Sequence, residues 1–301
     1  MMILGIISGL FAALFQSGSY VFSRQFLAKH NSSWLLIVYS QLAMGILGGI
    51  TMLFVPFGNL FHEPVRFLTT LVVWIAFMVI GQYAFFRTLR EIEASRLASL
   101  LGLKILILAA ISIIFLGVRL GGMQTVAIFV SVAAAMAMNW SGGGNISLKG
   151  CVWLFLTLLF YSLADLAETR MVLMVQTGNM IRDGIIIGGV SYFALGLSTV
   201  PVLFRCQRSW RLLRDAAPFG FAWFYAMTLL FMCFGALGTV FGNVVQSSRG
   251  LFSVLIGLIL AEMGANKIES KVSGFTWIRR GIAALLMMLA IFLYSYGSKM
   301  Q

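Results

Sequence analysis

The feature that most constrains this chain is a series of long apolar stretches that follow one another with only short polar connections between them. A helix needs roughly 20 mainly apolar residues to cross the hydrocarbon core of a bilayer. These stretches are continuous and do not alternate between apolar and polar residues, which favours helices over barrel strands. We therefore predict ten membrane-spanning helices, at residues 3–22, 34–55, 68–86, 98–116, 123–140, 151–168, 185–204, 219–240, 244–263 and 277–296.

The low content of charge supports an all-α, polytopic membrane protein. Hydrophobic residues make up 60% of the chain and charged residues only 10%, whereas a soluble domain carries about 25% charged residues. The net charge of +12 does not indicate a nucleic-acid partner. Most Lys and Arg residues lie in the short connections, where cations face lipid headgroups. The expected surroundings are a lipid bilayer, with no nucleic acid.

The sequence offers no recognisable metal, cofactor or catalytic motif. Cys151, Cys206 and Cys233 lack the spacing of metal ligands. Neither His-Glu-x-x-His nor Gly-x-Ser-x-Gly occurs. No Gly-Lys-Ser/Thr follows the glycine run at residues 142–144, so no phosphate-binding loop is expected there. We expect no metal, no cofactor and no enzymatic activity.

The chain divides into two halves of five predicted spans each. A glycine-rich stretch at residues 141–149 has the composition of a flexible linker, and it separates residues 1–140 from residues 150–301. Lys104 and Arg249 occupy equivalent places in the two halves, each deep inside an apolar run. Because each half has an odd number of spans, the second half enters the membrane from the opposite side. This arrangement predicts two inverted five-helix repeats, a common plan for secondary transporters.

Several segments are similar to a known transporter family. Residues 9–13 and 17–24 resemble the first helix of the ten-helix, EamA-like branch of the drug/metabolite transporter superfamily. Residues 95–101, 247–254 and 279–284 are similar to its fourth, ninth and tenth helices. The resemblance implies export or exchange of small metabolites through a central cavity between the halves. It also implies that both termini lie in the cytoplasm, whereas the distribution of Lys and Arg places them outside.

Together these features predict a secondary transporter that works by alternating access. The expected substrate is an amino acid or a similar small molecule, and the expected location is the plasma membrane, as a multi-pass protein of a bacterial inner membrane. A homodimer is one possible assembly. The alternatives are a membrane sensor or scaffold that does not transport and, with less support, an intramembrane enzyme.

Two cations inside the apolar runs are the first candidates for substrate binding. An ionisable group at the centre of a membrane helix costs about 2.5–3.5 kcal/mol on insertion scales. Lys104 and Arg249 are therefore expected to face a cavity and to attract an anionic or carboxylate-bearing substrate. The alternative is that each side chain snorkels to the interface along its long stem.

The span at residues 151–168 adds two carboxylates. Tyr161, Asp165 and Glu168 are spaced by four and three residues, which puts them on one helical face. The carboxylates could pair with the deep cations, bind a cationic group, or carry a coupling proton. For Glu168, the alternative is an interfacial pair with Arg170 or Arg182.

A polar stripe on the ninth predicted span, together with polar residues of the first and third spans, completes the predicted site. Such groups can also do no more than join helices by hydrogen bonds. The predicted substrate-binding residues are Gln16, Ser19, Tyr20, Gln82, Tyr83, Lys104, Tyr161, Asp165, Asn243, Gln246, Arg249 and Ser253. The predicted proton-coupling residues are Asp165 and Glu168.

Overall fold

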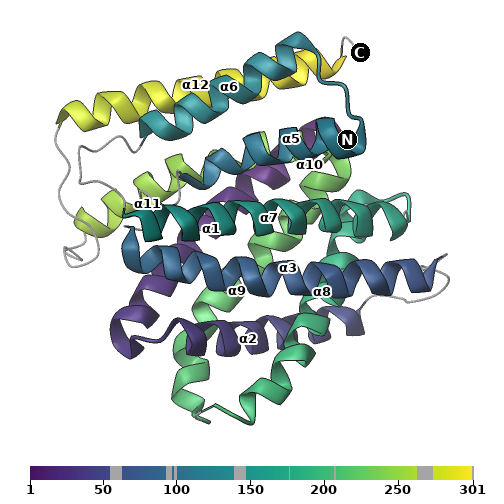
Figure 1. Ribbon diagram of the computed structural model, residues 1–301, viewed down its shortest axis with the longest axis vertical. Coiled ribbons are helices and arrows are strands. Elements are labelled where there is room, and N and C mark those ends of the chain that lie inside the picture. The colour runs from purple at the N-terminus through teal and green to yellow at the C-terminus, as the bar shows by residue number, and fades with distance from the viewer. Residues whose placement is uncertain are drawn as a thin grey trace.

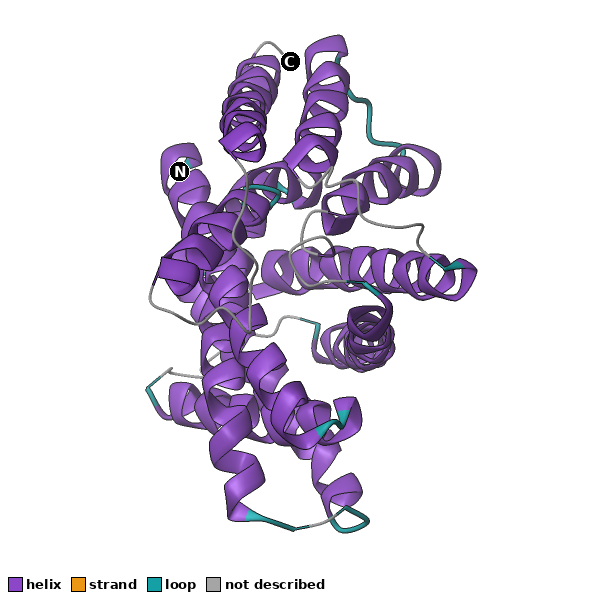
Figure 2. Ribbon diagram, turned by 90° about the vertical axis from the view of Figure 1, so that its left-hand side faces the viewer, coloured by secondary structure: helices purple, strands orange, loops and turns teal. Residues whose placement is uncertain are grey.

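The computed structural model describes residues 1–54, 63–92, 97, 100–138, 147–175, 177–206, 208–262 and 274–299. Every regular element within these ranges is helical (Figure 2), which confirms the predicted all-α class for this part of the chain. The elements in chain order are α1 (Met2–His30), α2 (Ser33–Leu53), α3 (Pro64–Glu91), the 3-10 helix η1 (Leu101–Leu103), α5 (Lys104–Leu116), α6 (Gly122–Met138), α7 (Leu148–Val175), α8 (Met180–Leu203), α9 (Trp210–Leu237), α10 (Thr239–Gln246), α11 (Arg249–Glu262) and α12 (Gly274–Lys299).

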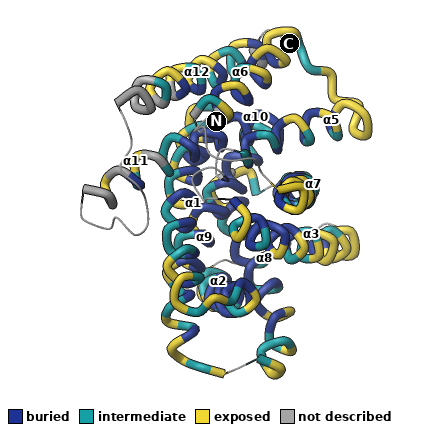
Figure 3. Tube along the Cα trace, turned by 60° about the vertical axis from the view of Figure 1, so that its left-hand side comes forward, coloured by how far each residue is buried: buried dark blue, intermediate teal, exposed yellow. Residues whose placement is uncertain are grey.

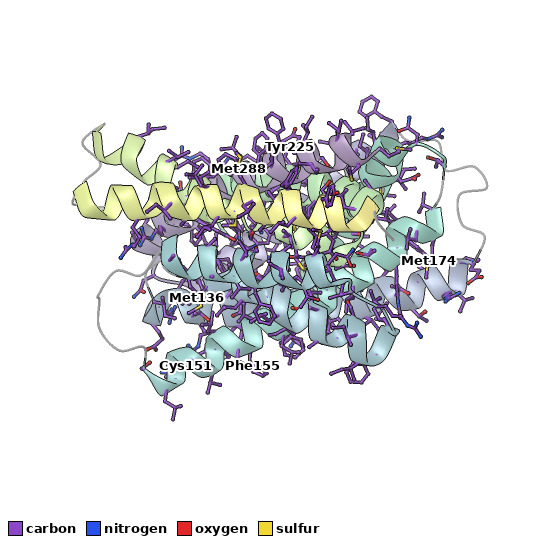
Figure 4. All side chains as sticks on the ribbon, turned by 90° about the horizontal axis from the view of Figure 1, so that it is seen from above. Met136, Cys151, Phe155, Met174, Tyr225 and Met288 are labelled. Carbon is purple, nitrogen blue, oxygen red and sulfur yellow. The ribbon has the colours of Figure 1, made fainter. Side chains whose placement is uncertain are left out.

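Helix length and the outer surface both fit a bilayer. Six helices, α1, α2, α3, α7, α8 and α9, are long and apolar enough to cross a membrane. Apolar side chains such as Phe155, Tyr225 and Met288 project from the margin of the molecule (Figure 4) and are 57%, 53% and 65% exposed. Exposed residues lie along the outward sides of the helices, and buried residues face inward (Figure 3). Lipid solvates such a surface, and the protein is a multi-pass membrane protein.

Each long helix packs against a helix from the other half of the chain. The most extensive pairs are α1 with α9, α2 with α8, α3 with α7, and α6 with α12, and Figure 1 shows α6 beside α12, with α5 and α10 beneath them. Glycine permits the closest approach. A Cβ atom added to Gly45 of α2 would lie 2.7 Å from the Cα atom of Gly196 in α8, so small residues bring these two backbones together.

The predicted spans differ from the observed helices at their ends. Helix α1 continues to His30, and α9 begins at Trp210 and ends at Leu237. Hydropathy locates only the part of a helix that lies in lipid, whereas the backbone stays helical into the polar interface. Most of the predicted linker, residues 141–146, lies outside the described residues, as do residues 55, 98, 139–140 and 263 at the ends of predicted spans. The count of ten spans remains a prediction.

Two predicted spans are wrong in a more informative way, because neither is one continuous α-helix. In the span at residues 98–116, the 3-10 helix η1 precedes α5. In the span at residues 244–263, Ser247 and Ser248 form a turn between α10 and α11. A break inside a membrane segment frees backbone groups that neighbouring side chains must satisfy. Both breaks lie next to the predicted deep cations.

Candidate functional site

A buried ion pair forms the centre of the polar residues. The Nζ atom of Lys104 lies 2.6 Å from Oδ2 of Asp165, and the two side chains are only 4% and 7% exposed. Asn243 on α10 donates its amide N–H to the same carboxylate oxygen at 2.7 Å. Lys104 therefore does not reach the surface, and the snorkelling alternative is wrong for this residue.

A chain of hydrogen bonds connects this pair to the second cation. The Lys104 ammonium donates to Oε1 of Gln246 at 3.5 Å. Gln246 in turn donates to Oε1 of Gln16 on α1 at 3.0 Å. The same Gln16 oxygen accepts a hydrogen bond from Nη1 of Arg249 at 3.4 Å. Helices α1, α5, α7, α10 and α11 thus meet in one buried polar network.

Each cation is the first residue of a helix that follows a break. Lys104 begins α5 directly after η1, and Arg249 begins α11 directly after the turn at Ser247 and Ser248. The N-terminus of a helix carries a partial positive charge and backbone N–H groups without intrahelical acceptors. The positive potential of the side chain and of the helix end therefore add at both places.

A serine contacts the backbone carbonyl at each break. The Ser17 hydroxyl of α1 lies 2.8 Å from the carbonyl oxygens of both Arg249 and Ala13, and it can donate its hydrogen to either. The Ser162 hydroxyl of α7 donates to the carbonyl of Leu158 in its own helix at 2.7 Å and lies 3.5 Å from the carbonyl oxygen of Lys104. The residue numbers of Ser17 and Ser162 differ by 145, as do those of Lys104 and Arg249. The two halves therefore present the same contact at equivalent positions.

The surroundings of the two cations differ in charge. Asp165 is the carboxylate beside Lys104, and the residue 145 positions earlier, beside Arg249, is the phenol Tyr20. Among the described residues, no carboxylate pairs with Arg249, and its Nε atom is buried without a hydrogen-bond partner. Arg249 is only 3% exposed. A buried guanidinium without a counter-ion is costly unless an anion joins it.

A second carboxylate lies one turn further along α7. Glu168 is 1% exposed, and its Oε1 atom accepts a hydrogen bond from the indole N–H of Trp74 at 2.8 Å. Its Oε2 atom is buried and has no partner among the described residues. Arg170 and Arg182 are both exposed, so the predicted interfacial pair of Glu168 with either arginine is wrong.

Aromatic rings border the polar network. Tyr20, Phe85, Tyr161 and Trp223 form a closed series of neighbours with centroid distances of 5.5, 6.2, 6.4 and 6.3 Å. The Tyr161 hydroxyl is buried without a hydrogen-bond partner. A Cβ atom at Gly81 would lie 2.7 Å from the Tyr161 ring, so glycine on α3 makes room for this ring. Unpaired polar atoms beside aromatic faces are typical of small-molecule sites.

Two of the predicted site residues lie apart from the network. Gln82 accepts a hydrogen bond from Gln41, which in turn accepts one from Thr199, each at 2.7 Å. This chain joins α3, α2 and α8, as the helix-joining alternative predicts. Tyr83 is 38% exposed and packs its ring edge against Trp153. Its side chain does not face the network, because neighbouring residues of a helix point in different directions.

Two predicted site residues, Ser19 and Ser253, form no side-chain hydrogen bond with the network among the described residues. The Ser19 hydroxyl donates to the carbonyl of Gln16 within α1 at 2.6 Å. The Ser253 hydroxyl oxygen is buried and has no partner among the described residues. The first satisfies itself locally, and the second lies one turn beyond Arg249 on α11.

Sequence reasoning missed four residues of the network and its border, namely Ser17, Trp74, Ser162 and Trp223. Serines inside apolar helices are too common to single out. The tryptophans offered a better signal, because a buried indole N–H needs an acceptor. Trp74 donates to Glu168 and Trp223 donates to Tyr192.

An apolar groove of about 840 Å³ lies between α2 and α8. It is lined by aliphatic residues, glycines and one aromatic ring, including Ile46, Ile50, Phe193 and Leu197. These residues belong to the outer surface, and Ile46 and Leu197 are 50% and 54% exposed. A groove without polar groups cannot orient a charged substrate, so we assign the site to the polar network.

Comparisons with known proteins agree with this fold. Residues 3–140 match the family model described as "EamA-like transporter family". Among solved structures, 29 chains match. One of them, titled "Crystal structure of protein", has a TM-score of 0.66 and is 15% identical over 97% of this chain and 96% of the other. At that identity, the likeness concerns the fold alone. No curated protein matches the chain in sequence.

Proposed function

We propose that this protein is a secondary transporter of the drug/metabolite transporter type. The premise is the match of residues 3–140 to the model of the EamA-like transporter family. The protein moves a small metabolite with an anionic group, an amino acid or a similar zwitterion, across the plasma membrane. The observation that carries the proposal is the buried polar network between the two halves, in which Arg249 lacks a carboxylate partner among the described residues.

In this proposal, Arg249 binds the substrate carboxylate. A guanidinium presents several N–H donors in a planar fork that matches a carboxylate, and its Nε–H is unpaired. The N-terminus of α11 adds its partial positive potential at the same place. The Glu168 oxygen without a partner offers an acceptor for an ammonium group. The aromatic series around Tyr20 and Trp223 suits the apolar part of the substrate.

Alternating access follows from two inverted repeats, residues 1–140 and 150–301. Several observations support this division. The Lys104 and Arg249 breaks, and the serines that hold them, recur at the same spacing. The helix pairing also follows this division. The counterparts of α1 and α9 in the other repeat are α7 and α3, and each of these two pairs is in extensive contact. Rocking one repeat against the other would expose the network to each side in turn.

The test is transport by the purified, full-length protein in liposomes, with a radiolabelled mixture of the standard amino acids as the probe. Wild-type protein should accumulate or exchange label, and Lys104→Ala and Arg249→Ala should not. Arg119→Ala is the matched control, because it removes an exposed cation outside the network. Thermal unfolding in detergent identifies variants that fail to fold.

Two results would count against the proposal. Normal flux through both network variants would remove Lys104 and Arg249 from the transport pathway. Saturable binding of a label by wild-type protein, with no flux in liposomes, would favour the sensor or scaffold.

A further inference from the structure

The two carboxylates of α7 lie one turn apart but have unequal surroundings. Asp165 is fixed, because one of its oxygens receives both the Lys104 ammonium at 2.6 Å and the Asn243 amide at 2.7 Å. Glu168 has one neutral donor, the Trp74 indole, on Oε1. Its Oε2 atom is buried and has no partner among the described residues. Asp165 is therefore bonded to a cation, whereas Glu168 is bonded, among the described residues, only to a neutral donor.

Within the described part of the chain, no cation is bonded to Glu168. Trp74 of α3 donates a neutral hydrogen bond. Lys104 of α5 acts on Glu168 electrostatically but is bonded to Asp165, which lies on the same helix as Glu168 and carries the same sign of charge. Tyr192 of α8 also interacts electrostatically with Glu168. Neighbours of this kind leave Oε2 free to gain or lose a proton.

We propose that Glu168 is the group that binds and releases a coupling proton during transport, while Asp165 remains the permanent counter-ion of Lys104. This inference rests on the proposed transport function and names its coupling ion. When the site opens to one side, water delivers a proton to Oε2, and an O–H bond forms there. The Trp74 hydrogen bond to Oε1 remains. When the site opens to the other side, the O–H bond breaks and the proton returns to water.

Burial connects this step to the conformational change. Glu168 is only 1% exposed, with the aromatic residues Trp74, Tyr192 and Phe231 packed together at the interface of α3, α8 and α9. Water cannot reach Oε2 until these helices separate. A proton taken up on one side is therefore carried inside the protein until the site opens again. One proton crosses per cycle, and no other bond is made or broken.

The first experiment needs no substrate. Infrared difference spectra of purified, full-length protein between alkaline buffer and buffer near about pH 6, where exposed carboxylates stay ionised, should show the carbonyl band of a protonated carboxylic acid. The band should be absent in Glu168→Gln and present in Asp165→Asn. Glu168→Gln keeps an acceptor for Trp74, which favours normal folding. Trp74→Phe keeps the carboxyl group and should move the pH at which the band develops.

The second experiment uses liposomes and the labelled amino-acid mixture. A pH gradient should drive accumulation by wild-type protein, whereas Glu168→Gln should lose this response. Loss of the infrared band in Asp165→Asn, with its persistence in Glu168→Gln, would overturn the inference. Wild-type flux that ignores a pH gradient would also overturn it and leave transport intact. A Glu168 band without flux of any label would instead count against the transport function.

Discussion

The two helix breaks are built alike and differ in one neighbour. At each break a short segment that is not α-helical, a 3-10 helix or a turn, precedes a helix whose first residue is a buried cation. A serine from the other half of the chain contacts the backbone carbonyl of that cation. At the first break, an aspartate accompanies the cation, whereas at the second a tyrosine stands in the equivalent place. The first break is therefore neutral as a unit, and the second keeps a net positive charge.

This difference assigns separate tasks to the two breaks. A buried pair such as Lys104 and Asp165 contributes little net stability, but removal of one partner leaves a charge that nothing compensates. Arg249 already stands without a carboxylate among the described residues, and its hydrogen bond to Gln16 compensates the charge only in part. A bound anion would complete it. The first break is thus complete without a ligand, whereas the second is suited to one.

The largest expected effect comes from breaking the neutral unit. Asp165→Asn leaves the Lys104 ammonium buried without a counter-ion, and we expect a loss of about 3–5 kcal/mol in the free energy of unfolding. Transport should be lost as well. Thermal or denaturant unfolding in detergent measures the first effect, and liposome flux measures the second.

The double variant Lys104→Met with Asp165→Asn is the control for this prediction. It removes both charges and keeps an oxygen acceptor for Asn243. Stability should return to within about 1–2 kcal/mol of wild type, since a buried pair can be replaced by neutral groups at little cost. If Asp165→Asn alone unfolds like wild type, the pair has no structural role.

Part of this comparison could be predicted from the sequence. The matching depth of Lys104 and Arg249 in the two halves marked both cations, and helical spacing placed Asp165 and Glu168 on one face. The breaks could not be predicted, because hydropathy stays high across them and no proline marks them. The bond between Trp74 and Glu168 joins residues 94 positions apart, and no local pattern encodes such a contact.

Gln82 and Tyr83 show what helical geometry alone says about two adjacent candidates. Gln82 and Tyr83 are adjacent in α3, and successive residues of a helix point about 100° apart, so both could not face one site equally. Gln82 turns toward α2, and Tyr83 turns outward. The choice between them depends on which face α3 presents to α7, and that is a property of packing.

The second prediction concerns a variant in which both breaks have a carboxylate beside the cation. Tyr20→Glu introduces a carboxylate beside Arg249, in imitation of Asp165 beside Lys104. We expect this carboxylate to compete with the anionic group of the substrate and to weaken transport by roughly ten- to a hundredfold, the equivalent of a lost charge-assisted bond of about 1.5–3 kcal/mol. Concentration dependence of liposome flux measures the change.

Tyr20→Phe is the matched control for that variant, because it keeps the aromatic ring and adds no charge. Its flux should stay much closer to that of wild type. If Tyr20→Glu and Tyr20→Phe lose flux equally, transport depends on the Tyr20 hydroxyl and not on the charge balance at Arg249.

The smallest effect, and the finest test of the comparison, uses the two anchoring serines. Ser17→Ala removes a hydrogen bond of 2.8 Å to the carbonyl of Arg249. Ser162→Ala removes a bond of 2.7 Å within α7 and a contact of 3.5 Å with the carbonyl of Lys104. Each should cost about 0.5–1.5 kcal/mol in the free energy of unfolding. Only Ser17→Ala should also reduce the apparent affinity for substrate, because it loosens the backbone of Arg249, the residue that we propose binds the substrate. An equal loss of affinity in Ser162→Ala would show that the two breaks share the ligand, and the division of tasks between them would be wrong.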